Sequence, residues 1–216
     1  MNSKYNSSLS AASNFQREDV EVLSRERVLA GFLTLERLQL RHRLFKGGWS
    51  ETMRRELLVK DPAVGVLLFD PIRDEIVFVR QFRAGMLDEP GSPWLLELVA
   101  GMVEAGEQPL QVALRESKEE AGCVPTDLVE IGSYYNSPGT SNEKVTLFCG
   151  RVDAAGVEGV FGLSEEHEDI EVLVLPYSEA LLAVESGIID NAMSIIAVQW
   201  LQLHKQELLQ RWNLST

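Results

Sequence analysis

The sequence predicts an α/β fold, a sandwich in which helices flank a mixed sheet. Short apolar runs rich in β-branched and aromatic residues alternate along the chain with segments of helical apolar spacing. Between Val20 and Phe45, apolar and charged residues alternate, which predicts strands with one exposed face. A chain of 216 residues with 45% hydrophobic content buries one good-sized core, or one core plus a small appended element. We therefore expect one main domain and a small N-terminal β-subdomain.

Three regions are predicted along the chain. Residues 1–18 are polar and lack an apolar core, so we expect a disordered tail and neither a signal peptide nor a membrane anchor. Residues 19–58 form the β-subdomain and residues 59–216 the main domain. No run of about 18 apolar residues occurs, so the expectation is a cytoplasmic protein with no membrane partner.

Net charge and the spacing of the cysteines argue against a nucleic-acid-binding protein and against a zinc site. The net charge of -13 would repel a phosphate backbone, so no nucleic-acid partner is expected. Cys123 and Cys149 lie in apolar segments without the spacing of a zinc site, and we interpret both as reduced packing residues.

The expected elements of the main domain follow in order. Residues 63–70 and 75–83 are β-rich runs joined by the turn sequence PIRD, which predicts a hairpin. A further strand ends at Gly101, and a helix is expected from Leu110 to Gly122. Strands are then predicted at residues 128–135, 144–153 and 170–176, and helical spacing at residues 178–187 and 191–212.

The helix expected at residues 110–122 collects acidic side chains. Its predicted core stripe consists of Leu110, Leu114, Ser117 and Ala121. Glu116 and Glu120 share another face, Glu119 lies beside them, and Glu107 comes from the preceding loop. Such an arrangement is commonly a solvated acidic face, although like charges four residues apart cost about 0.2–0.5 kcal/mol. Hard divalent cations prefer carboxylate oxygens, so a metal site would explain the cluster.

This stretch resembles the signature of the Nudix family, in which a glycine, a glutamate and an Arg-Glu-x-x-Glu-Glu-x-Gly run recur at fixed spacing. The matching positions are Gly101, Glu107, Arg115, Glu116, Glu119, Glu120 and Gly122. Ser117 departs from the pattern, where a larger aliphatic residue is usual. The resemblance implies a Nudix-type α/β/α sandwich that binds Mg²⁺, with Mn²⁺ as a substitute, and hydrolyses a nucleoside diphosphate linked to another group.

Further similarity points to the bacterial ADP-ribose pyrophosphatase branch of that family. Pro138 follows Cys123 by fifteen residues, a spacing similar to the mark of that branch. Taken alone, a Pro-Gly pair is first a turn signal. Similar segments extend over roughly residues 20–208. The resemblance implies a homodimer whose N-terminal β-subdomains are exchanged, so that each site is lined by both chains.

The resemblance also implies residue roles. Glu116, Glu120 and Glu119, the carbonyl of Ala100 and Glu168 would hold the metal ions, and Glu166 would be the general base. Glu116, Glu120 and Glu166 are thus the expected catalytic set. Arg115 is expected to be an ion-pair partner of the acids. His167, between Glu166 and Glu168, is an alternative base because histidine titrates near neutral pH, but we rank it below Glu166 because the matching family position need not be histidine.

Substrate contacts are implied by the same similarity. Arg83 would bind the diphosphate, and Phe32 would pack on the adenine. Arg55, Glu56 and Lys60 would reach the ligand from the partner subunit, although a surface charge pair remains the alternative for Arg54 and Arg55. The other expected contacts are Met102, Ser137, Pro138, Gly139 and Glu143.

The expected reaction is Mg²⁺-dependent hydrolysis of ADP-ribose, and possibly of other ADP-sugars, to AMP and ribose 5-phosphate in the ADP-ribose case. One alternative is a hydrolase of a different nucleoside diphosphate derivative, namely a nucleotide sugar, NADH or a dinucleoside polyphosphate. Pro138 and the acidic segment GLSEEHED favour ADP-ribose. A second alternative is a non-catalytic sugar-nucleotide sensor, which would often lose the metal acids and carry a basic DNA-binding extension.

Overall fold

The computed structural model describes residues 15–214, which form two compact units. One unit combines the chain up to Lys60 with the segment Ser137–Asn142, and the other contains Asp61–Asn136 and the chain from Glu143 onward. Most of the tail predicted for residues 1–18 lies outside the described residues, and a short 3-10 helix, η1, covers Arg17–Asp19. Within residues 15–214, no helix is long and apolar enough to cross a membrane.

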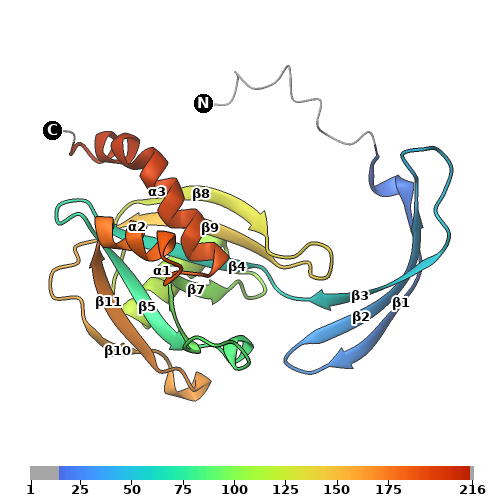
Figure 1. Ribbon diagram of the computed structural model, residues 1–216, viewed down its shortest axis with the longest axis horizontal. Coiled ribbons are helices and arrows are strands. Elements are labelled where there is room, and N and C mark those ends of the chain that lie inside the picture. Colours follow the sequence, from blue (N-terminus) through green and yellow to red (C-terminus); the bar gives the residue numbers. More distant parts are fainter. Residues whose placement is uncertain (1–14, 215–216) are drawn as a thin grey trace. The chain divides into compact units, whose positions relative to one another are not determined.

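The N-terminal unit is a three-stranded antiparallel sheet in the order β1-β2-β3 (Figure 1). Its strands span β1 (Val20–Ala30), β2 (Thr34–His42) and β3 (Met53–Val59). The segment Ser137–Asn142 joins this unit because the N–H of Leu58 donates to the carbonyl of Thr140 at 2.8 Å. No residue of β1 is buried.

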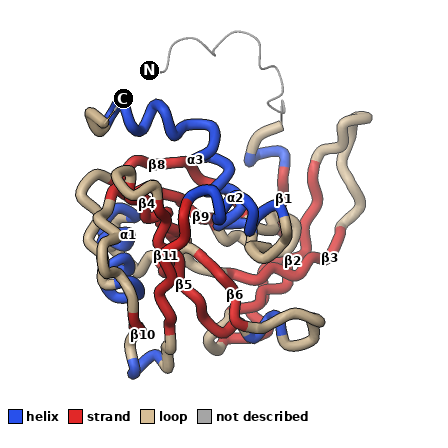
Figure 2. Tube along the Cα trace, turned by 60° about the vertical axis from the view of Figure 1, so that its left-hand side comes forward, coloured by secondary structure: helices blue, strands red, loops and turns tan. Residues whose placement is uncertain are grey.

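The second unit is built on an eight-stranded mixed sheet (Figure 2). Its main path runs β10-β11-β5-β4-β9-β8, with β6 on β5 and β7 on β4. The pair β4 and β9 is parallel, and the other pairs are antiparallel. The strands span β4 (Ala63–Asp70), β5 (Glu75–Phe82), β6 (Trp94–Glu97), β7 (Val99–Met102), β8 (Leu128–Tyr135), β9 (Lys144–Arg151), β10 (Gly159–Phe161) and β11 (Ile170–Pro176).

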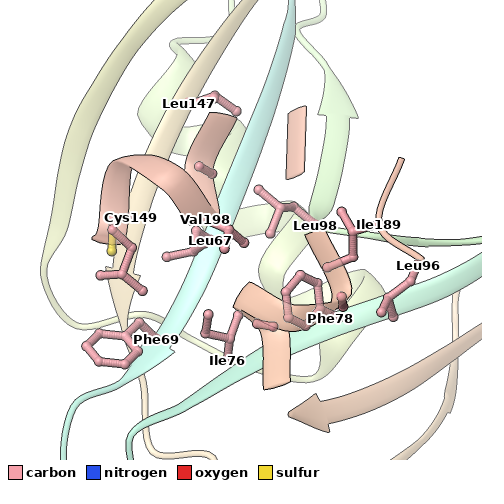
Figure 3. Packing of buried hydrophobic residues seen from close by; sticks show 14 of the residues in the cluster. Leu67, Phe69, Ile76, Phe78, Leu96, Leu98, Leu147, Cys149, Ile189 and Val198 are labelled. Carbon is pink, nitrogen blue, oxygen red and sulfur yellow. The ribbon is translucent and has the colours of Figure 1, made fainter. Parts of the chain in front are cut away.

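Helices cover both faces of this sheet. They span α1 (Pro109–Ala121), α2 (Tyr177–Glu185) and α3 (Ala192–Arg211), with the 3-10 helices η2 (Ala84–Met86) and η3 (Ser164–Glu166) in loops. Strand β4 shows how the two cores arise, because successive side chains alternate between faces. Leu67 and Phe69 join a core cluster with residues of α2 and α3 (Figure 3), whereas Val66 and Leu68 join a cluster with residues of α1. The predicted α/β/α sandwich with a mixed sheet is confirmed.

The core stripe predicted for α1 was partly wrong. Leu110 and Leu114 are 48% and 37% exposed, whereas Ser117 and Ala121 are buried as expected. The buried face is Val112, Ala113, Ser117, Glu120 and Ala121. The helix is rotated from the predicted orientation so that an acid, Glu120, lies against the sheet.

Two smaller sequence predictions are also decided by the structure. The single strand expected before Gly101 is two strands, β6 and β7, which separate at Leu98 to pair with different neighbours. Cys123 and Cys149 are free and buried, as predicted.

Candidate active site

Local sequence determines where helix α1 begins and ends. Pro109 occupies the first turn, where a missing N–H removes no helical hydrogen bond. Gly122 ends the helix in the left-handed conformation, with φ at 63°, and its N–H donates to the carbonyl of Lys118. Phe161 packs so closely on Gly122 that a Cβ there would collide with the ring. These contacts hold the acidic helix between the loop before it and strand β10 after it.

Strand β7 receives two glutamates of α1. A Cβ at Gly101 would collide with the carboxylate of Glu116, so a glycine is needed where that side chain meets the strand. One oxygen of Glu120, Oε2, accepts a hydrogen bond from the N–H of Ala100 at 2.9 Å. Ala100, Glu116 and Glu120, three of the predicted metal ligands, are thereby brought together.

Burial dominates the acidity of these two carboxyl groups. It raises the pKa of Glu120 to about 8; the Ala100 N–H opposes the shift, the charges of Glu116 and Glu168 add to it, and Arg83 opposes it. Burial likewise raises the pKa of Glu116 to about 7, opposed by Arg115 and supported by Glu119 and Glu168. The two carboxyl groups therefore lie in a low-dielectric region that lacks sufficient compensating positive charge.

Arg115 organises the acids on the outer side of the helix. Its Nη1 donates to Oε1 of Glu116 at 2.8 Å and to Oε2 of Glu119 at 3.0 Å. Its Nε donates to Oε1 of Glu107 at 3.3 Å. Arg115 therefore has the geometry expected of an ion-pair partner, and it joins the loop acid Glu107 to the helix.

The loop that contains Glu168 is attached to the same helix. The N–H of Gly162 donates to the carbonyl of Glu119 at 3.4 Å. Oε2 of Glu168 accepts from the N–H of Leu163 at 3.1 Å, and this acid raises the pKa values of both Glu116 and Glu120. Glu166 is the last residue of η3, and the position of its side chain lies outside what the structure describes. Its assignment as the general base stays a prediction.

The donor set fits a hard divalent cation. Glu116, Glu120 and Glu168 offer carboxylate oxygens, which Mg²⁺ and Mn²⁺ prefer. Among residues 15–214, no three acidic, histidine or cysteine side chains are already arranged as a metal cage. Arg115 engages one oxygen of Glu116 and one oxygen of Glu119.

Three predicted substrate contacts belong to the same unit as the acids. Arg83 follows β5, and its Nε donates to Oε2 of Glu97 at 2.7 Å. Met102 ends β7 and is 51% exposed. Glu143 precedes β9 and accepts from Nδ2 of Asn136 at 2.6 Å. The sequence analysis missed Glu97, which stands out as the one acid within the apolar run WLLELVAG.

The remaining predicted contacts belong to the N-terminal unit. Phe32 lies between β1 and β2 and is 92% exposed, Arg55 and Glu56 are on β3, and the N–H of Lys60 donates to Oδ1 of Asn142 at 2.8 Å. The carbonyl of Ser137 accepts from the N–H groups of Thr140 and Ser141, which closes a turn around Pro138 and Gly139. The roles of these residues in ligand binding stay predictions.

Comparison with known proteins decides the family. The NUDIX domain model matches residues 59–193, more than half of the chain. This chain belongs to the Nudix family. The match includes the loop, strand β7 and helix α1 described above, and it confirms the family resemblance drawn from Gly101–Gly122.

Relatives within the Nudix family cover almost the whole chain. The ADP-ribose pyrophosphatase of Haemophilus influenzae is 45% identical over 210 residues, covering 96% of this chain and 97% of that protein. The ADP-ribose pyrophosphatase of Escherichia coli strain K12 is 45% identical over 198 residues, covering 92% and 95%. A crystal structure described as an ADP compounds hydrolase superimposes with a TM-score of 0.69, covering 94% of this chain and 100% of that one. At 19% identity, this last similarity establishes the fold alone.

Proposed function

We propose that this Nudix protein hydrolyses ADP-ribose to AMP and ribose 5-phosphate and that it requires a divalent metal ion, preferably Mg²⁺. The observation that supports the metal-dependent chemistry is the pair of carboxyl groups of Glu116, partly buried, and Glu120, buried, held against Gly101 and Ala100. The substrate is supported by the near full-length relatives named ADP-ribose pyrophosphatase.

Within this proposal, the acids of α1 and Glu168 are the residues that would hold the metal ions. Bound metal would neutralise the charge that develops on the phosphate oxygens and orient the attacking water. Glu166 takes the proton from that water. Arg83 offers paired N–H donors that suit phosphate oxygens, and its position after β5 places its charge near Glu120.

We further propose that the active form is a homodimer. Strand β1 has no buried residue, and apolar side chains of the β1–β2 hairpin are exposed, among them Val22, Leu23, Leu29, Phe32 and Leu33. A second copy would cover such an apolar surface, and Arg55, Glu56 and Lys60 would then approach the ligand of the other subunit. Light scattering coupled to gel filtration tests this: a monomer at micromolar protein concentration would contradict it.

The substrate is tested with purified protein, Mg²⁺ and a panel of ADP-ribose, ADP-glucose, NADH, GDP-mannose and a dinucleoside polyphosphate, with products separated by chromatography. ADP-ribose is expected to be cleaved best, to AMP. If another compound is preferred, the metal helix stands but the proposed substrate fails. If ADP-ribose binds and nothing is cleaved, the protein is a sensor.

The same assay separates the roles of metal ligand and base. Glu166→Gln is expected to reduce kcat by about 10²–10⁴, the usual contribution of a general base. Glu116→Gln is expected to reduce kcat further, because it removes a carboxylate that would hold the metal ions. Glu207→Gln, an exposed acid on α3, is the control and should leave kcat unchanged. Equal activity of Glu166→Gln and the control would overturn the base assignment.

A further inference from the structure

Glu97 and Arg83 form a closely held pair beside the acid cluster. Glu97 ends β6, and its side chain is 15% exposed. Its Oε2 accepts from Nε of Arg83 at 2.7 Å, and the N–H of Arg83 donates to the carbonyl of Pro93 at 2.7 Å. Both the backbone and the side chain of Arg83 are therefore bonded to the segment that contains β6.

Helix α3 fixes the backbone on both sides of Glu97. Nδ2 of Asn191 donates to the carbonyl of Leu96 at 2.9 Å, and the N–H of Leu98 donates to Oγ of the fully buried Ser194 at 3.1 Å. Asn191 also caps α3 by accepting from the N–H of Ser194. These contacts occur at the junction where β6, paired with β5, ends and β7, paired with β4, begins. At this junction, side chains supply the hydrogen bonds that a continuous strand would make. The backbone on both sides of Glu97 is therefore held by hydrogen bonds to helix α3 and its cap.

Burial opposes the ionised form of Glu97. Burial raises the pKa of Glu97 although the charge and hydrogen bond of Arg83 oppose this shift, and the charge of Asp190 adds to it. An acid whose ionised form is disfavoured at its site contributes little to folding even when it has a partner. Such unfavourable placement is typical of functional sites. The charge of Arg83 in turn lowers the pKa of Glu120, so the guanidinium acts on the acid cluster as well as on Glu97.

We propose that Glu97 is a positioning residue for substrate binding: by accepting from Nε, it orients the guanidinium of Arg83 so that its two Nη groups face the diphosphate. Guanidinium groups bind phosphate through paired N–H donors in one plane, so the orientation of that plane determines whether two bonds or one can form. This inference rests on the proposed function for the role of Arg83, and it assigns no contact with substrate to Glu97 itself.

The test is a double-mutant cycle on kcat and KM for ADP-ribose with Mg²⁺, using Glu97→Gln, Arg83→Ala and the double variant. Glu97→Gln keeps the size of the side chain and removes its charge. It is expected to raise KM about tenfold, the effect of weakening a charged hydrogen bond, with kcat nearly unchanged and an unaltered melting temperature. In the Arg83→Ala background, Glu97→Gln should have no further effect on KM.

The matched control is Glu171→Gln, which removes the partner of Arg80 on the same strand β5. Oε2 of Glu171 lies 2.8 Å from Nη1 of Arg80 in an exposed cross-strand pair. Wild-type KM is expected for this variant. The proposal would be overturned by a wild-type KM for Glu97→Gln. It would also be overturned if the increases in KM of the two single variants multiplied in the double variant.

A separate readout distinguishes failure of this inference from failure of the proposed function. If the wild type leaves ADP-ribose intact, the proposed substrate is wrong, and the cycle is judged on the dissociation constant of ADP measured by calorimetry with Mg²⁺. Positioning through Arg83 is supported if Glu97→Gln weakens the affinity for ADP tenfold in the wild-type background and has no effect in the Arg83→Ala background. Independent effects in the ADP titrations contradict it.

Discussion

Glu119 and Glu120 are neighbours in the sequence but face different surroundings around helix α1. The side chain of Glu119 is 29% exposed and pairs with Arg115. Glu120 is 3% exposed and faces strand β7, where burial raises its pKa. Successive residues of a helix lie about 100° apart, so one acid reaches the outer side, where Arg115 compensates its charge, and the other enters the core without a comparable partner. The comparison shows that the same residue type is buried against the sheet at one position of the helix and paired with an arginine at the next.

The largest expected difference between the two sides is kinetic. Glu120→Gln removes a proposed metal ligand and is expected to reduce kcat by about 10³ or more, because charge stabilisation by a metal ion is worth several kcal/mol. Glu119→Gln is expected to reduce kcat by about tenfold or less, because Arg115 already engages that oxygen. Steady-state assays with Mg²⁺ measure both. Similar losses in the two variants would break the comparison.

A second difference appears in the pH dependence of stability. The folded pKa values of Glu116 and Glu120, about 7 and about 8, lie above the ordinary value of 4.5, so the native state binds more protons than the unfolded state between these values. Their effect on stability is thus most favourable at low pH and becomes unfavourable as pH rises from about 4.5 to 8.

The measurement is the melting temperature at pH 6 and pH 8, in EDTA and in Mg²⁺. In EDTA, Glu120→Gln should lose less stability than the wild type between these pH values. Added Mg²⁺ should stabilise the wild type more at pH 8 than at pH 6, because it binds the ionised carboxylates. An identical pH response of the variant and the wild type in EDTA would contradict the burial of an uncompensated acid.

The apolar positions of α1 sharpen the same comparison. Val112 is fully buried on the sheet-facing side, and Val112→Ala is expected to lower the free energy of unfolding by about 1.5–2.5 kcal/mol. Leu110 is 48% exposed, and Leu110→Ala is expected to change it by less than about 1 kcal/mol. Urea unfolding followed by circular dichroism measures both. A larger loss of unfolding free energy for Leu110→Ala than for Val112→Ala would support the buried stripe that was predicted from the sequence.

The smallest expected effect concerns the outer side. Arg115→Ala leaves Glu107, Glu116 and Glu119 without their shared partner and is expected to lower the melting temperature by about 2–4 °C in metal-free buffer. In Mg²⁺ the loss should shrink, since the cation compensates Glu116. Scanning calorimetry in both buffers checks this, with Arg211→Ala, at the exposed pair with Asp127, as the control.

Local chemistry explains why much of the site was predictable. The spacing of Glu116 and Glu120 on one helix is a property of the sequence alone, and the continuous apolar run of β4 is typical of a strand buried on both faces. The prediction was wrong for Leu110 and Leu114 because the apolar positions of α1 allow more than one buried stripe. The hydrogen bond from Ala100 to Glu120 and the close fit of Glu116 on Gly101 accompany the observed stripe, and neither can be found by counting residues along a helix.

The sequence by itself determined most of the elements, the family and the acids of α1, because hydrophobic periodicity and fixed helical spacing are local properties of the chain. Only the tertiary structure decided that Glu120 is the buried acid, that Glu97 holds Arg83, and that the loop with Glu168 is attached to α1. These features depend on strand register and on the closure of loops between distant segments. They arise from packing and hydrogen bonding between parts of the chain whose proximity no local pattern encodes.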